Sequence, residues 1–185
     1  SVENVFTIGS IEIEQHEQQR NELGELVDFE QNKQLIPVIN NDTAKTDVNF
    51  QDKIVTVENT GTNEAYVRTY FAVRSDIASL ITLDFADATE NGWVKDTHTE
   101  TTATIDGINY TLVSYTYTPY LDKASAQSGK VTSPLLKGVY MNANVDVVES
   151  YDSSNANFVV DGTTITTFNV NTDTVDVIVT TQGVQ

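Results

Sequence analysis

Apolar residues recur at every second position along many short stretches of this chain. In residues 53–58, Val55 and Val57 share one parity, and residues 65–74 continue the same alternation. Successive side chains of a strand point to opposite faces, so this period predicts strands with one buried face. The polar residues 59–63 separate the two stretches, which we expect to pair as an antiparallel hairpin or meander.

Two Asp-Gly pairs stand between further alternating stretches. Asp106-Gly107 and Asp161-Gly162 are each flanked by residues rich in Thr, Val and Ile. Asp-Gly suits a tight hairpin turn, because both central positions of that turn require positive φ. Strands are therefore expected at 101–105, 108–117, 139–148, 157–160, 163–168 and 175–181.

Helical periodicity occurs in one short stretch. The apolar residues that share a helical face there are Ile77, Leu80, Ile81 and Phe85. They predict one short helix. Residues 16–26 are polar and fit a helical turn or a loop, and residues 28–50 and 121–134 have the composition of loops. Many short strands between turns predict an all-β fold, an antiparallel β-sandwich of jelly-roll type.

The apolar residues at the start of the chain change parity. Val2, Phe6 and Ile8 lie on even positions, whereas Ile11 and Ile13 lie on odd positions. The buried face of a strand therefore switches between the two groups.

Gly9 and Ser10 lie where the parity changes. Glycine permits a bulge or a bend at such a point. Gly9 either marks a bulge in one ordinary edge strand, or it forms a hinge between two strands that serve different sheets. One of those sheets can belong to a neighbouring molecule, and the pattern alone leaves both interpretations open.

Composition narrows the choice of partners. The chain has 185 residues, most simply one domain, with a formal net charge of −17. Nucleic acid and anionic membranes are poor partners for such a chain, because their phosphates are repelled. No stretch approaches the roughly 20 apolar residues that a membrane span needs. The start at Ser1-Val2 without Met fits a mature chain whose signal peptide has been removed.

Catalytic motifs are scarce. The chain has no cysteine, which excludes thiol catalysis and Cys-based metal sites. His16 opens a sequence similar to the zinc-protease helix motif, but Arg20 stands where the second histidine is required. His98 lies in a polar stretch without a second imidazole nearby. We therefore expect no enzyme, no catalytic residues and no zinc site.

Calcium is a stronger candidate, because it prefers oxygen ligands and several stretches are rich in aspartate. These stretches span residues 84–90, 146–152 and 173–176. Solvated acids on an acidic surface are the simpler explanation of these stretches. Asn41 and Asn109 fit the N-glycosylation pattern, which matters only in an organism that glycosylates exported chains.

Several stretches, read in order, carry a family resemblance. They are residues 6–13, residues 55–68, Trp93, the Asp106-Gly107 pair with Tyr110, Tyr115 and Tyr117, residues 133–140 and residues 175–185. In this order they resemble the TasA/camelysin group of exported bacterial proteins, which are related to some archaeal bundling pilins. The polar stretch 14–49 departs from the family pattern.

The resemblance implies a function as well as a fold. It implies a secreted subunit of an extracellular biofilm-matrix fibre, a homopolymer assembled head-to-tail by donor-strand exchange and able to bundle laterally. Residues 1–10 are then the donor strand and hinge, with Val2, Phe6 and Ile8 as plugs, and residues 11–185 form one β-sandwich domain. The alternative is a monomeric secreted domain, either a surface adhesin or a metallopeptidase-like protein.

Overall fold

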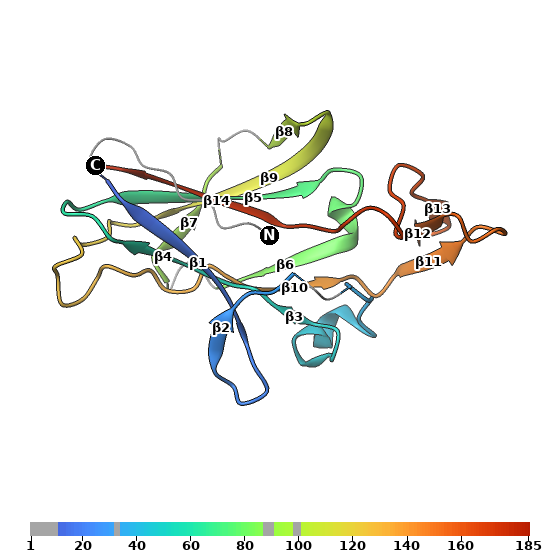
Figure 1. Cartoon of the computed structure of the whole chain (residues 1–185), viewed down its shortest axis with the longest axis horizontal. Coiled ribbons are helices and arrows are strands. Elements are labelled where there is room, and N and C mark those ends of the chain that lie inside the picture. The colour runs from blue at the N-terminus through green and yellow to red at the C-terminus, as the bar shows by residue number, and fades with distance from the viewer. Residues whose placement is uncertain (1–10, 32–33, 87–90, 98–100) are drawn as a thin grey trace.

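The computed structural model describes residues 11–31, 34–86, 91–97 and 101–185 (Figure 1). The expected donor strand and hinge, residues 1–10, therefore lie outside the described residues, as does His98. The described chain is mostly β, and its sheets are antiparallel. This confirms the all-β class predicted from the alternating pattern.

The largest sheet has the strand order β14-β5-β9-β7, and β8 pairs with β9 as well. These strands span Ile178–Val184 (β14), Tyr66–Arg74 (β5), Ile108–Tyr117 (β9), Trp93–Lys95 (β7) and Thr102–Ile105 (β8). In β5 the inward residues are fully buried and include Val67 and Phe71, as the sequence pattern predicted.

Within the described residues there are three smaller sheets, in the orders β2-β1-β4, β3-β10-β6 and β11-β12-β13. The first comprises Ile13–Arg20 (β1), Leu26–Asp28 (β2) and Ile54–Asn59 (β4). The second comprises Gln51–Asp52 (β3), Leu136–Met141 (β10) and Ile81–Phe85 (β6). The third comprises Val145–Glu149 (β11), Ala156–Val160 (β12) and Thr163–Thr164 (β13), and it lies at one end of the molecule (Figure 1).

The hydrophobic core lies between the largest sheet and the strands β1, β4, β6 and β10 (Figure 1). Phe71 of β5 meets Phe85 of β6 edge to face, with ring centroids 5.0 Å apart, and Phe85 also contacts Tyr115 of β9 at 4.7 Å. Aromatic side chains bury much apolar surface, so these contacts hold the two layers together.

Both predicted Asp-Gly hairpins are confirmed. Asp106 and Gly107 join β8 to β9, and Asp161 and Gly162 join β12 to β13. All four residues have positive φ, between 48° and 78°, as the turn requires.

The expected hairpin between residues 53–58 and 65–74 is wrong. Each stretch forms a strand, but β4 pairs with β1 whereas β5 pairs with β14 and β9. The buried Asn59 organises the connection: its side-chain amide donates to the Asn63 carbonyl at 2.8 Å and its side-chain oxygen accepts from the Gly61 amide at 3.0 Å. The chain therefore crosses from one layer to the other at this point.

The predicted helix at residues 77–85 is also wrong. Only Ala78–Leu80 (η2) form a short 3₁₀ helix, and residues 81–85 form the strand β6. Short apolar runs fit both periods, and here Ile81 and Leu83 pair with β10 instead. A second 3₁₀ segment, Asn41–Thr46 (η1), lies within the stretch expected to be a loop.

Several other boundaries differ from the sequence prediction. The strand expected at 163–168 is limited to Thr163–Thr164, and the one expected at 175–181 is Ile178–Val184. Residues 16–20 belong to strand β1 rather than to a helical turn or loop, because His16 to Gln18 continue the ladder with β4. The expected strand at 139–148 is divided into β10 and β11 by a turn at residues 142–144.

Candidate functional site

Strand β1 is the element that would connect a donor segment to the rest of the chain. Its first residue, Ile13, and Ile11 just before it are fully buried, as their parity predicted. They pack over Gly183 of β14, where an added Cβ would lie 3.1 Å from each of the two isoleucine side chains. The start of β1 is therefore held against the edge strand of the largest sheet.

A buried polar network continues this contact. Gln15, the next inward residue of β1, donates through Nε2 to the Val179 carbonyl at 3.1 Å. Its Oε1 accepts from the Thr181 hydroxyl at 2.6 Å, and that hydroxyl lies 2.8 Å from the hydroxyl of Thr69. Because buried polar groups need partners, the network fixes the register of β1 against β14 and β5.

A buried ion pair lies one step further along the same face. Glu17 Oε1 is 2.9 Å from Lys53 Nζ, and the side chains are 6 % and 1 % exposed. The Lys53 ammonium also lies 4.2 Å from the centroid of the Phe29 ring. Burial lowers the pKa of Lys53, and the attraction of Glu17 opposes that shift.

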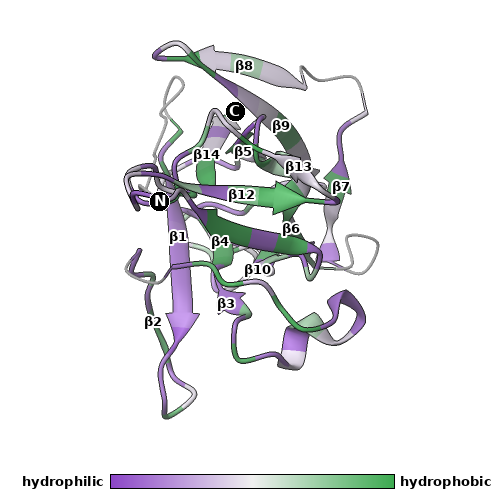
Figure 2. Cartoon of the chain, turned by 90° about the vertical axis from the view of Figure 1, so that its right-hand side faces the viewer, coloured by the Kyte–Doolittle hydropathy of each residue, from purple (hydrophilic) through white to green (hydrophobic). Residues whose placement is uncertain are grey.

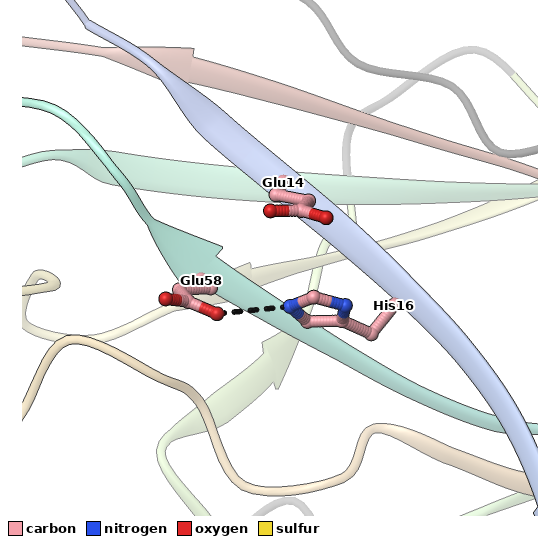
Figure 3. Close-up of side chains that lie close together, drawn as sticks. All are labelled: Glu14, His16 and Glu58. Atoms are coloured by element: carbon pink, nitrogen blue, oxygen red, sulfur yellow. Dashed lines mark hydrogen bonds and ion pairs between the residues drawn. The ribbon is translucent and has the colours of Figure 1, made fainter. Parts of the chain in front are cut away.

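The outward face of β1 carries a different group of side chains. Glu14, His16 and, on the neighbouring strand β4, Glu58 point toward one another (Figure 3). Figure 2 shows that β1 is hydrophilic along most of its length. His16 Nε2 lies 3.0 Å from Glu58 Oε1, and the ligand atoms of the three residues lie within 4.8 Å of one another. One imidazole and two carboxylates are residue types that bind transition metals.

The described acidic residues of the expected calcium stretches do not gather in one site, and Asp87 and Glu90 lie outside the described residues. The Glu14–His16–Glu58 cluster is the only group of at least three His, Asp or Glu residues that lie this close within the described part of the chain. Asp84 instead lies 3.5 Å from Lys45, and Asp152 accepts hydrogen bonds from its neighbour Ser154.

The remaining predicted site residues fall into two groups. Val2, Phe6, Ile8, Gly9 and Ser10 lie outside the described residues, so their roles stay predictions. Both candidate glycosylation residues are exposed. The Asn41 side-chain oxygen accepts from the Ala143 amide, and that of Asn109 accepts from the Thr104 hydroxyl.

Sequence reasoning missed the cluster on the outward face of β1. His16 was compared with a zinc-binding motif that lies on a helix, whereas in the structure this residue lies on a strand. The alternation Glu14-x-His16 places both side chains on one face. Glu58, 42 residues further along the chain than His16, joins them only through the pairing of β1 with β4.

In comparisons with known proteins, no protein family, no curated protein and no solved structure matches this chain. Within the described residues, no helix has the length and apolar character needed to cross a membrane.

Proposed function

We propose that this protein is the structural subunit of an extracellular filament, with a jelly-roll-like sandwich as its body. Residues 1–8 form a donor strand that completes a sheet of the next subunit, and Gly9 and Ser10 are the hinge. The observation that carries the proposal is the burial of Ile11 and Ile13 against Gly183. It anchors the chain directly after a segment whose apolar residues have the opposite parity.

An added strand also needs an open sheet edge. Among the described strands, β6 pairs with β10 on one side and with no other strand. Leu83 and Phe85 of β6 are only partly buried although they pack against the core. An edge of this kind supports the proposal, because main-chain groups and partly exposed apolar side chains are available together.

Burial of the proposed plugs favours assembly. Burying Val2, Phe6 and Ile8 contributes about 5–9 kcal/mol before the cost of ordering the segment. A head-to-tail contact that does not close into a ring produces an open filament. Identical subunits are then the principal partners of each chain.

Deletion of residues 1–8 tests the proposal. We expect the truncated protein to keep its β-structure by circular dichroism but to form no filaments in negative-stain micrographs. Phe6→Asp is expected to have nearly the same effect. The matched control Thr7→Asp adds the same charge at the opposite parity and is expected to leave filaments intact. Filaments of unchanged form from the truncated chain would show that the donor-strand proposal is wrong.

A further inference from the structure

We propose that Glu14, His16 and Glu58 form a binding site for a divalent transition metal of the zinc type. The site joins β1 to β4 on the outward face of their sheet (Figure 3). This inference does not rest on the proposed filament, because all three ligands belong to one chain.

The strand register brings the three side chains together. Glu14 lies directly opposite Glu58 in the antiparallel ladder, and His16 is two residues further along the same face of β1. Two ligand atoms on one tetrahedral zinc lie about 3.3–3.6 Å apart, given metal–ligand distances of about 2.0–2.2 Å. The His16–Glu58 pair is at 3.0 Å and all three ligand atoms lie within 4.8 Å, so small side-chain rotations bring them to one ion.

The charges around the cluster favour a cation. Like charges directly opposite each other on paired strands are unfavourable, and Glu14 and Glu58 stand in that relation. Neither carboxylate forms an ion pair with a lysine or arginine of the described chain. By contrast, the buried Glu17 is paired with Lys53. A bound divalent cation would be coordinated by both glutamates and would offset the repulsion between them.

The donor set selects among cations. Calcium prefers about six to eight oxygen ligands, whereas an imidazole nitrogen with carboxylate oxygens suits zinc and its neighbours. The side chains of His16 and Glu58 are 31 % and 32 % exposed, so solvent reaches the cluster. Zinc sites with three protein ligands keep a fourth coordination position for water, and this cluster has the same number of ligands and access to solvent.

Metal titration of the full chain tests the proposal. After treatment with a chelator, the protein is titrated with Co²⁺, followed by visible absorption, and with Zn²⁺, followed by calorimetry. We expect one ion per chain, the d–d absorption bands of a low-coordinate Co²⁺ site, and a higher Tm with Zn²⁺. We expect Ca²⁺ at equal ionic strength to give no comparable calorimetric signal.

Single substitutions test which residues bind the metal. His16→Gln and Glu58→Gln are each expected to weaken Zn²⁺ binding by more than the roughly 10–100-fold that loss of an outer-shell partner causes. Glu12→Gln removes an exposed charge just before β1 and outside the cluster, and His98→Gln removes the other histidine. Both controls are expected to bind as the unchanged protein does. Equal binding of Zn²⁺ and Ca²⁺, or unaltered binding by His16→Gln with an intact circular dichroism spectrum, would overturn the proposal.

Discussion

At the scale of single residues, polar side chains determine how β1 meets the core. Glu17 and Lys53 are nearly inaccessible to solvent and form one ion pair at 2.9 Å. Desolvation of two charges offsets much of their attraction, so the pair specifies the position of β1 more than it adds stability. Burial lowers the pKa of Lys53, and the nearby charge of Glu17 opposes this shift.

Removal of one member of this pair is expected to be costly. Lys53→Met leaves the Glu17 carboxylate without its buried cation, and we expect the free energy of unfolding to fall by about 3–5 kcal/mol. The double variant Glu17→Gln/Lys53→Met removes both charges and is expected to lose much less. Urea unfolding of Glu17→Gln, of Lys53→Met and of the double variant measures the coupling energy between the two charges. A double variant as unstable as Lys53→Met would contradict this account.

At the scale of the elements, the contact between β1 and β14 depends on Gly183. Its missing side chain makes room for Ile11 and Ile13, which would lie 3.1 Å from an added Cβ. The two strands approach closely only because this position of β14 is a glycine.

A larger side chain at this position is expected to separate the strands. Gly183→Val overpacks the contact, and we expect a loss of about 1–3 kcal/mol in the free energy of unfolding. Gln182→Val is the matched control, because residue 182 is exposed and points to the opposite face of β14. Thermal unfolding followed by circular dichroism compares the two variants. Equal stability of both would show that β1 has room to shift away from β14.

Some of the secondary-structure elements were predicted correctly from the sequence patterns, and others were not. Alternation located β4, β5 and β9, and the Asp-Gly pairs located both hairpins. The helix at residues 77–85 was wrong, since β6 obtains its partner from β10, far along the chain. The periodicity of a short segment carries no information about which distant strand will pair with it.

At the scale of the whole molecule, Arg74 at the end of β5 and Asp76 just after it contact Thr167 and Phe168, which follow β13 near the sheet β11-β12-β13 at one end of the molecule (Figure 1). Arg74 of β5 lies 2.8 Å from Asp76 and donates to the Thr167 carbonyl at 3.2 Å. The Thr167 hydroxyl donates to Asp76 at 2.7 Å, and the Arg74 guanidinium lies 4.8 Å from the Phe168 ring centroid. Burial raises the pKa of Asp76, but the hydrogen bonds from Arg74 and Thr167 outweigh it and lower the pKa overall.

This connection is expected to weaken in acid. A carboxyl whose pKa is lower in the folded chain stabilises it fully above the unfolded pKa of about 3.9 and loses that effect as the pH falls through the folded pKa. We therefore expect the stability difference between the unchanged protein and Asp76→Asn to be constant near neutral pH and to shrink below about pH 4. Urea unfolding at a series of pH values measures it, with Asp146→Asn reporting the loss of an exposed charge. A difference that stays constant down to pH 2 would contradict the role of Asp76.

The sequence by itself determined the β class, the two Asp-Gly turns and the inward parity of Ile11 and Ile13. These features depend on side-chain alternation and on backbone preferences of neighbouring residues, which act within a few positions. Only the tertiary structure decided that β4 and β5 lie in different sheets and that His16 lies beside Glu58. Strand pairing and register depend on contacts between residues far apart in the chain, so the Glu14–His16–Glu58 cluster exists only once β1 has paired with β4.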